Sequence, residues 1–213
     1  MKEIRRILIL GLGSIGSRHL RIIKKLRPEI SIYVLRRPGF KESKLDHLIK
    51  KVFTNIDDAI CFGFDAAIIA TPSIFHVSQA IKLVKNQIPI LIEKPLSNKL
   101  EDCFELSKIA KHNKSIILVG FVLRYTSVLK RFREIILNKN LDKINSIFIK
   151  CSSYLPNWRK NKNYKESVSA KKSLGGGVLL ELSHEIDYAN WIFGPFKILE
   201  SELSNSGKLD IDV

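Results

Sequence analysis

Residues 7–23, with the sequence ILILGLGSIGSRHLRII, decide the fold. Residues 7–10 are apolar without interruption, which is typical of a strand that is buried on both faces. Apolar side chains then recur at helical spacing, so we expect a helix over residues 14–25. A buried strand that passes through a glycine-rich turn into a helix is the opening unit of a doubly wound α/β fold.

The same alternation of buried strands and helices continues to residue 121. We expect strands at residues 30–35, 52–53, 66–70, 88–92 and 116–121, with helices at residues 75–85 and 100–111. Strands that are apolar on both faces and separated by helices indicate a parallel sheet covered on both sides. The sequence therefore predicts a Rossmann domain over residues 1–121.

The pattern changes over residues 122–213, which we assign to a second, partial α+β domain. Expected here are helices at residues 127–137 and 178–193, strands at 145–154 and 197–203, and a long polar loop at 156–172. Two strands without further partners make only a marginal sheet in water. We therefore expect the chain to be a truncated form of a longer one.

The glycine-rich turn predicts a nucleotide site. Gly11 allows the tight turn, Gly13 lets the backbone approach a pyrophosphate, and Gly16 lets helix and strand pack closely. Ser14 and Ile15 open the helix, whose N-terminal N–H groups can bind phosphate oxygens. The spacing in this strand–turn–helix context favours a dinucleotide cofactor over a glycine-rich turn without a ligand.

The residues after the second strand bear on which dinucleotide binds. Enzymes that use NAD usually carry Asp or Glu about 20 residues after the fingerprint, where the side chain holds the ribose 2′-hydroxyl. This chain has Arg36 and Arg37 there instead, and no acid before Glu42. Two guanidinium groups suit a 2′-phosphate, so NADP is the preferred prediction and NAD the alternative. The alternative is that both arginines are simply solvated residues at a strand end.

Two other strand ends carry polar residues. Thr71, Pro72 and His76 follow the strand at 66–70, and Glu93 and Lys94 follow the strand at 88–92. The carboxyl ends of parallel strands form the ligand crevice, so we assign all five to the cofactor site. His76 could also be an ordinary helix-surface histidine. The ammonium group of Lys94 could bind a substrate oxygen and move a proton, which makes it a candidate catalytic residue.

A third candidate site follows the glycines at 175–177. Glu181, His184 and Asp187 are three residues apart on an expected helix, so neighbours among them share a face. A histidine beside carboxylates is a plausible acid–base unit. The alternative is a solvated polar face on a packed helix. The ligand spacing is too sparse for a metal site, and we expect none.

Composition limits the other classes of function. The chain has 213 residues, with 36 Lys and Arg against 21 Asp and Glu, a formal net charge of +15. The basic residues are spread evenly and flank no recognition motif, so we expect no nucleic-acid partner. No apolar run is long enough to span a membrane. Three scattered cysteines predict reduced, mostly buried thiols, and we expect a cytoplasmic protein.

Five segments together resemble the Gfo/Idh/MocA family of sugar and inositol dehydrogenases. They are GLGSIGSRH (11–19), ATPSIFH (70–76), EKPLS (93–97), GFVLRY (120–125) and GGGVLLELSHEIDYANWIFG (175–194). The resemblance implies a Rossmann domain followed by an open, mostly antiparallel sheet. It also implies NAD(P)-dependent oxidation or reduction of a sugar-like substrate, with Lys94 and His184 handling the proton.

The resemblance has departures and open points. The family commonly has an aspartate four residues before the histidine, where this chain has Leu180, so a direct role for Glu181 is in doubt. Members are also longer, and the missing part completes the substrate floor and the oligomer surface, so a homo-oligomer is expected only of the full-length domain. The alternative function is a non-catalytic NAD(P)-binding protein.

The polar loop and its surroundings supply the substrate candidates. Tyr154, Trp158 and Arg159 suit a sugar that carries an acidic group or a nucleotide. We group Arg124 and Asp187 with them. This combination resembles dehydrogenases of surface-polysaccharide and acidic-sugar pathways, although the segment could also be a mobile surface loop.

Overall fold

The computed structural model describes residues 3–138, 143–158, 163–205 and 209–212. The chain divides into two compact units, Met1–Gly120 and Phe121–Val213. The boundary expected from the sequence lies one residue later. Each unit is described separately below.

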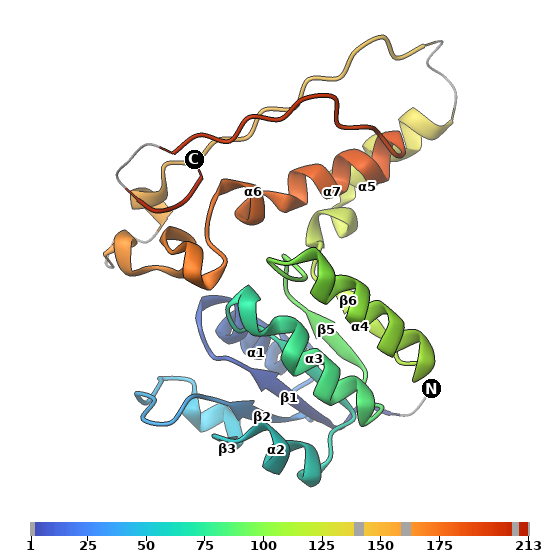
Figure 1. Cartoon of the computed structure of the whole chain (residues 1–213). Coiled ribbons are helices and arrows are strands. Elements are labelled where there is room, and N and C mark those ends of the chain that lie inside the picture. Colours follow the sequence, from blue (N-terminus) through green and yellow to red (C-terminus); the bar gives the residue numbers. More distant parts are fainter. Residues whose placement is uncertain (1–2, 139–142, 159–162, 206–208, 213) are drawn as a thin grey trace. The chain divides into compact units, whose positions relative to one another are not determined.

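The first unit is built on a six-stranded parallel sheet with the order β3-β2-β1-β4-β5-β6 (Figure 1). The strands are β1 (Arg6–Leu10), β2 (Ser31–Leu35), β3 (Ile49–Phe53), β4 (Ala66–Ile69), β5 (Ile90–Ile92) and β6 (Ile117–Val119). This order is that of the Rossmann fold. It reverses direction between β1 and β4, and ligands of open α/β sheets bind at such a switch point, beyond the carboxyl ends of the strands.

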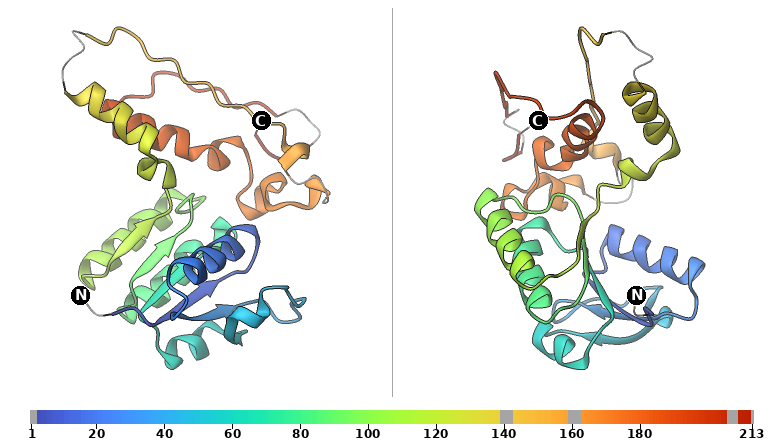
Figure 2. Two further views of the ribbon diagram at one scale, coloured as in Figure 1. Left: turned by 180° about the vertical axis from the view of Figure 1, so that it is seen from behind. Right: turned by 90° about the vertical axis from the view of Figure 1, so that its right-hand side faces the viewer.

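Helices cover both faces of this sheet, as Figure 2 shows in its right-hand view. One face is covered by α1 (Ser14–Leu26), and the other by α2 (Ile56–Phe62), α3 (His76–Lys85) and α4 (Leu100–His112). Two short 3₁₀ helices, η1 (Asp46–Leu48) and η2 (Ser73–Phe75), precede β3 and α3. The doubly wound α/β fold predicted from the sequence is confirmed.

Residues 7–10 of strand β1 show why a buried strand is apolar without interruption. Ile7 and Ile9 belong to the core beneath α1, where they pack with Leu20. Leu8 and Leu10 belong to the opposite core, which the other three helices cover. Because successive side chains point to opposite faces, a strand with two covered faces needs an apolar residue at every position.

Helix α2 is the element of the first unit that the sequence analysis missed. It has seven residues, and its N-cap is Asn55, whose side chain accepts hydrogen bonds from the N–H groups of Asp57 and Asp58. Gly63 ends it with a φ of +81°. An Asn followed by two acids and closed by a glycine is a helix signal, but the apolar periodicity of so short a segment is weak.

His76 fastens two of the loops that follow strands. It is 1% exposed, and its ring nitrogens lie 2.8 Å from the carbonyl oxygen of Thr71 and 2.9 Å from that of Pro95. Burial lowers the pKa of the His76 imidazole and outweighs the two backbone hydrogen bonds, which act to raise it. The ring therefore lies between the loop after β4 and the loop after β5, and in its neutral form it donates a hydrogen bond to one of the two carbonyls.

The second unit consists of helices and irregular segments. Helix α5 (Ser127–Leu137) has the predicted bounds, and the 3₁₀ helix η3 (Val122–Tyr125) precedes it. The expected long loop contains short 3₁₀ turns at η4 (Leu155–Trp158), η5 (Tyr164–Glu166), η6 (Val168–Ala170) and η7 (Lys172–Leu174). Helices α6 (Val178–Glu181) and α7 (Ser183–Phe193) follow.

The strands expected at 145–154 and 197–203 are wrong. Both segments are extended, but among the described residues of this unit no strand ladder forms, so the open antiparallel sheet is not seen there. Phe148 is 88% exposed and Leu199 is 95% exposed. Alternating side chains specify which face of a strand would be buried, but a strand also needs a neighbour that supplies hydrogen bonds and cover.

The single helix expected over residues 178–193 is interrupted at Leu182. The N–H of Glu185 donates to the carbonyl of Leu182, three residues back, instead of continuing an α-helical pattern across the junction. The hydroxyl of Ser183 donates to the carbonyl of Leu180 at 2.9 Å. A serine that bonds to a nearby backbone carbonyl competes with the helix, which accounts for the break.

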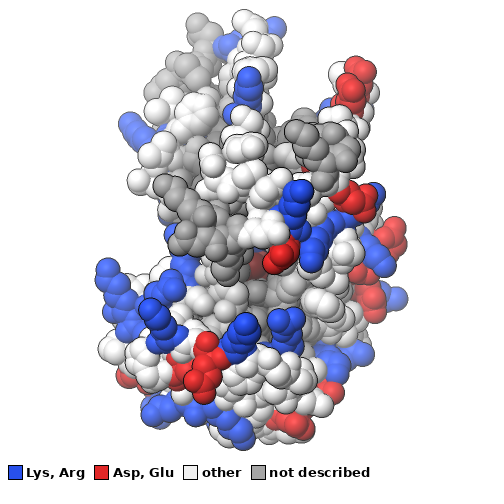
Figure 3. All heavy atoms as spheres, turned by 90° about the vertical axis from the view of Figure 1, so that its left-hand side faces the viewer, with Lys and Arg blue, Asp and Glu red and all other residues white. Residues whose placement is uncertain are grey.

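Surface charge, helix hydrophobicity and cysteine exposure can be compared with what the composition predicts. On the face that Figure 3 shows, Lys and Arg side chains are dispersed among uncharged and acidic ones. Among the described residues, no helix combines the length and the apolar character that crossing a bilayer demands. The cysteines are free, but Cys61 and Cys151 are exposed and Cys103 is half-buried, so the expectation of mostly buried thiols is wrong.

We predict that Gly16→Ala disrupts the first unit while Gly13→Ala does not. A Cβ atom at Gly16 would lie 2.0 Å from the carbonyl oxygen of Gly11, whereas a Cβ at Gly13 would have no atom within 4 Å. Chemical denaturation should show Gly16→Ala less stable by about 3 kcal/mol or more. Gly13→Ala, at a helix N-cap, should cost less than about 1 kcal/mol. Equal stability of the two variants would contradict this packing.

We also predict that the His76 ring makes the fold sensitive to mild acid. Because the folded chain lowers the pKa of this group below its ordinary 6.5, the unfolded chain binds more protons near that pH. The free energy of unfolding should therefore fall as the pH drops from about 7.5 to 5.5. Urea titrations should show a smaller fall for His76→Gln, and an equal or larger fall would contradict the assignment.

Candidate functional site

The glycine-rich turn lies at the carboxyl end of β1 and begins α1. Gly11 has a φ of +86°, and a Cβ there would lie 2.9 Å from the carbonyl oxygen of Ala70 at the end of β4. Its N–H donates to the carbonyl of Leu35 at the end of β2, at 3.0 Å. Gly11 and Gly16 are therefore required by the fold itself.

Gly13 is different, because nothing in the fold requires a glycine there. It is the N-cap of α1, with a φ of −71° that any residue can adopt. No side chain caps this helix end, and its first turn contains no acid. The N–H groups of the first turn, including those of Ser14 and Ile15, have no partner one turn earlier in a helix. An uncapped helix N-terminus beside an open space fits the pyrophosphate of a dinucleotide.

Thr71 lies beside this turn. The methyl group of Thr71 would be 3.1 Å from a Cβ at Gly11, and its hydroxyl donates to the Oε1 atom of Gln79 at 2.8 Å. Pro72 is the N-cap of η2. The ring of His76 is buried with a nitrogen close to each of two backbone carbonyls, and its contact with the cofactor stays a prediction.

Glu93 is buried at the end of β5 and pairs with His19, a residue that the analysis of candidate sites missed. The Nε2 atom of His19 lies 2.6 Å from the Oε1 atom of Glu93. A Cβ at Gly120 would lie 3.1 Å from the other carboxylate oxygen. The pair links α1 to the strand end that carries Lys94, so Glu93 positions this region through protein contacts. His19 lay within the quoted GLGSIGSRH segment, but its partner is 74 residues away.

Lys94 is half-buried directly after β5. Its peptide bond to Pro95 is cis. The residue stands at the carboxyl edge of the sheet, one residue after the Glu93 carboxylate that accepts from His19. This is the edge at which ligands of parallel sheets bind, so the position agrees with a role in cofactor or substrate binding.

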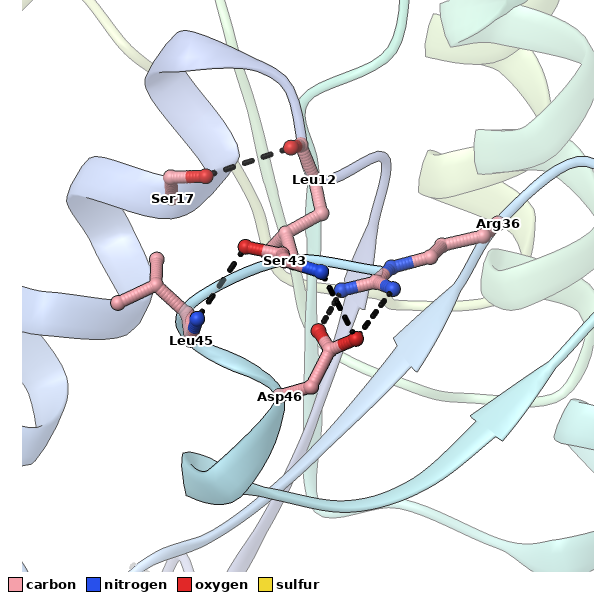
Figure 4. Close-up of polar contacts among 6 residues, drawn as sticks. All are labelled: Leu12, Ser17, Arg36, Ser43, Leu45 and Asp46. Atoms are coloured by element: carbon pink, nitrogen blue, oxygen red, sulfur yellow. Dashed lines mark hydrogen bonds and ion pairs between the residues drawn. The ribbon is translucent and has the colours of Figure 1, made fainter. Parts of the chain in front are cut away.

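Arg36 does not face open solvent at the end of β2. It is buried, and its guanidinium group forms a two-pronged ion pair with the carboxylate of Asp46 in η1 (Figure 4). The Phe40 ring lies 4.6 Å from its central carbon. Arg37 is exposed. The two arginines therefore differ, and only Arg37 presents an exposed guanidinium group to an incoming phosphate.

In the second unit, His184 contacts a carboxylate other than the expected one. Its Nε2 atom lies 3.2 Å from the Oε1 atom of Glu185, while its buried Nδ1 atom has no hydrogen-bond partner among the described residues. The hydroxyl of Tyr188 donates to the same carboxylate at 2.6 Å. Burial, with this hydrogen bond, raises the pKa of Tyr188 to about 12. Glu181 and His184 do not share one helix face, because the helix is interrupted at Leu182 between them.

Arg124 and Asp187 form an ion pair with each other. The Nε and terminal nitrogen atoms of Arg124 lie 2.7 Å and 2.5 Å from the two oxygens of Asp187. This contact, more than any other, raises the pKa of the Arg124 guanidinium. The pair joins η3 to α7, and the ring of Trp191 lies 6.0 Å from the guanidinium carbon. Both residues thus have a structural role, and their role toward substrate stays a prediction.

The predicted substrate loop is described only in part. Tyr154 is exposed, and Trp158 donates its indole N–H to the hydroxyl of Ser153 at 2.5 Å. Arg159 lies outside the described residues. Within the described ranges, no group of three or more His, Cys, Asp or Glu side chains is arranged to hold a metal ion.

Comparisons with known proteins identify both halves. Residues 5–121 match the Gfo/Idh/MocA family described as an oxidoreductase family with an NAD-binding Rossmann fold. Residues 133–210 match the C-terminal alpha/beta domain of the same oxidoreductase family. The two matches together span most of the chain and follow the order predicted from the motifs.

Individual relatives are similar in sequence to this chain over part of their own length. An uncharacterized oxidoreductase of Synechocystis is 29% identical over 140 residues, 65% of this chain and 37% of the relative. Glucose-6-phosphate 3-dehydrogenase of Bacillus subtilis is 25% identical over 199 residues, 92% of this chain and 56% of the relative. This chain thus spans only about a third to a little over half of their lengths.

A solved structure shows the same fold. The WlbA dehydrogenase of Bordetella pertussis, determined with NADH and UDP-GlcNAcA, superposes with a TM-score of 0.74 at 20% identity. The superposition covers 89% of this chain and 55% of that one. With both family regions matched in sequence, the chain belongs to the Gfo/Idh/MocA family of oxidoreductases.

Proposed function

We propose that this chain takes part in an NAD(P)-dependent oxidation or reduction at a hydroxyl or keto carbon of a sugar-like substrate. Membership of the oxidoreductase family supports the reaction class. The chain spans only part of its relatives, so the activity of the whole protein is included in the proposal.

The observation that carries the proposal is the open space at Gly13. Gly11 and Gly16 are explained by close backbone contacts, but a Cβ atom at Gly13 would have no atom within 4 Å. A glycine is useful at such a place when something outside the chain must approach the backbone. The uncapped start of α1 beside it would donate N–H groups to phosphate oxygens.

Lys94 and His184 are proposed to serve the reacting oxygen of the substrate. When bound, the nicotinamide supplies or accepts the hydride. The ammonium group of Lys94 would hydrogen-bond the substrate oxygen, and His184 would accept or return its proton. The Glu185 carboxylate, 3.2 Å from the Nε2 atom of His184, would orient the ring.

The substrate class is proposed from side chains and from one neighbour. Exposed aromatic rings at Tyr154 and Trp158 can pack against a sugar, and Arg159 would favour an acidic group on it. The WlbA structure contains UDP-GlcNAcA, an acidic sugar nucleotide, which agrees with this class. We extend the proposal to acidic-sugar or surface-polysaccharide metabolism on this support.

The form of the dinucleotide is a separate matter. The predicted preference for NADP rested on Arg36 and Arg37 acting together on a 2′-phosphate. Arg36 is already paired with Asp46, so half of that physical support is lost. We therefore propose a nicotinamide dinucleotide here without assigning the 2′-phosphate.

The dinucleotide site is tested by Gly13→Ala. The added methyl group should occupy the space needed by the pyrophosphate and weaken binding of NADH and NADPH by about 10-fold or more, equivalent to 1.4 kcal/mol. A fluorescence titration measures the affinity, and unfolding in urea verifies that the variant is as stable as expected. Unchanged affinity for a dinucleotide that binds the wild-type chain would show that the pyrophosphate lies elsewhere.

The role of Lys94 is tested by Lys94→Met. Without the ammonium group, turnover should drop by about 10²-fold or more, because a positioned acid–base group contributes at least that much. Affinity for the dinucleotide should stay nearly the same. Lys99→Met is the matched control, since Lys99 is an exposed lysine at the start of α4 and should leave turnover unaffected. Unchanged turnover in Lys94→Met would remove this residue from the mechanism.

A second candidate function is dinucleotide binding without catalysis. The extended segments at 145–154 and 197–203, which carry exposed apolar side chains, favour it, because a substrate site built on them would lack a sheet. The two candidates differ in one measurement. Turnover of any sugar or inositol with NAD or NADP establishes the enzyme, while tight dinucleotide binding with no turnover across a substrate panel favours the binding protein.

A further inference from the structure

The end of β2 is the place where a Rossmann domain distinguishes its cofactors. The side chain that follows this strand meets the adenosine ribose, and its charge favours either a 2′-hydroxyl or a 2′-phosphate. In this chain the position is held by Arg36, directly after Leu35, whose carbonyl accepts from Gly11 in the glycine-rich turn. Arg36 is thus fixed next to the turn that would hold the pyrophosphate.

The guanidinium group of Arg36 is immobilised from several sides. It is 7% exposed, with one terminal nitrogen 3.1 Å from a carboxylate oxygen of Asp46 and the other in contact with the second oxygen. Its flat face lies over Phe40 at 4.6 Å. Its Nε atom is buried and has no hydrogen-bond partner among the described residues. To bind a phosphate, Arg36 would have to give up an ion pair that is already two-pronged.

Asp46 is held in place by the loop that carries it. Its carboxylate accepts the N–H of Ser43 at 3.0 Å, and Asp46 is the first residue of η1. Leu45 and Leu48 on either side pack against the same core cluster as Leu12 of the glycine-rich turn. Figure 4 shows Arg36, Ser43 and Asp46 gathered beside Leu12. The loop and the turn are therefore parts of one packed structure.

The carboxylate of Asp46 keeps its negative charge and part of its surface. The hydrogen bond from Arg36, aided by that from Ser43, lowers the pKa of the Asp46 carboxyl. The side chain is 30% exposed, in contrast to the buried arginine. At the end of β2 the Asp46 carboxylate is therefore accessible to a ligand, whereas the guanidinium group of Arg36 is buried.

We propose that Asp46 determines cofactor form, favouring the nicotinamide dinucleotide that has a 2′-hydroxyl over the one that has a 2′-phosphate. The carboxylate would accept a hydrogen bond from the ribose hydroxyl, as the acid directly after β2 does in other NAD-binding domains. It would repel a phosphate group, which carries a charge of roughly −2 near neutral pH. This inference rests on the proposed function, because it concerns the same dinucleotide site.

The assignment reverses the preference that the two arginines predict from the sequence. The acid is absent from its usual place and comes from ten residues beyond Arg36, where the loop folds back onto the strand end. Arg36 becomes a positioning residue for Asp46, and the exposed Arg37 is the only one of the pair that presents its charge to solvent.

The test compares NADH and NADPH binding to the full chain by fluorescence titration. Wild type should bind NADH more tightly, and Asp46→Asn should move the ratio of the two dissociation constants toward NADPH by about 10-fold or more, which corresponds to 1.4 kcal/mol. Glu29→Gln is the matched control. Glu29 also pairs with an arginine, Arg27, but it lies before β2, at the opposite end of that strand, so the ratio should not change.

Each outcome decides a separate point. Tighter NADPH binding by wild type, or an unchanged ratio in Asp46→Asn, overturns the role of Asp46 and leaves the dinucleotide site intact. Failure of folded wild type to bind either dinucleotide overturns the proposed function and this inference with it. If Asp46→Asn unfolds because Arg36 is left buried, the double variant Arg36→Met with Asp46→Leu removes both charges. It should likewise lose discrimination against NADPH, and retained discrimination overturns the inference.

Discussion

The close approach of α1 to β1 is the constraint on which the nucleotide-binding half depends. A Cβ atom at Gly16 would be 2.0 Å from the carbonyl oxygen of Gly11, so only glycine lets the two elements meet. That approach sets the N-terminus of α1 at the carboxyl end of β1. It also leaves Gly11 free to donate to Leu35, which fixes where β2 ends and where Arg36 begins. Gly11 and Gly16 thus fix the positions of the proposed phosphate site and of the residue beside it.

The first unit could be predicted from the sequence because most of its strands are recognisable as uninterrupted apolar runs. Residues 7–10 of β1 and the whole of β4 and β5 are apolar, as positions covered by helices on both faces require. The edge strand β3 (Ile49–Phe53) was predicted at only its last two residues. Its middle is Lys50 and Lys51, and a strand with only one neighbour tolerates such exposed charges.

The strands expected in the second unit were wrong because the alternation of apolar side chains describes one segment at a time and does not show whether a partner strand is present. Alternation over residues 145–154 is a property of that segment alone, whereas a strand in a sheet needs a second segment to hydrogen-bond with it. Phe148 lies almost fully exposed, since the described residues supply no sheet to cover it. The break at Leu182 has a similar origin. The apolar spacing of 178–193 is helical, but the hydroxyl of Ser183 bonds back to Leu180, and no periodicity reveals that competition.

Candidate site residues were predictable by type and position but not by partner. Arg36 was expected to meet a phosphate and instead meets Asp46, and His184 was expected to share a face with Glu181 and instead contacts Glu185. Glu93 meets His19 from a helix far away in the sequence. In each case the partner comes from a loop or helix whose path the sequence alone does not give.

These pairings matter more to recognition than the net charge does. A formal net charge of +15 attracts any phosphate compound at long range, and it attracts the more highly charged one more strongly. Such a field is screened beyond about 8 Å at physiological salt, so groups in contact with the ligand decide between similar ligands. At the end of β2 a half-buried carboxylate pairs with a buried arginine, and this carboxylate is the contact group that we propose. A basic chain can therefore carry a local site whose preference runs against its overall charge.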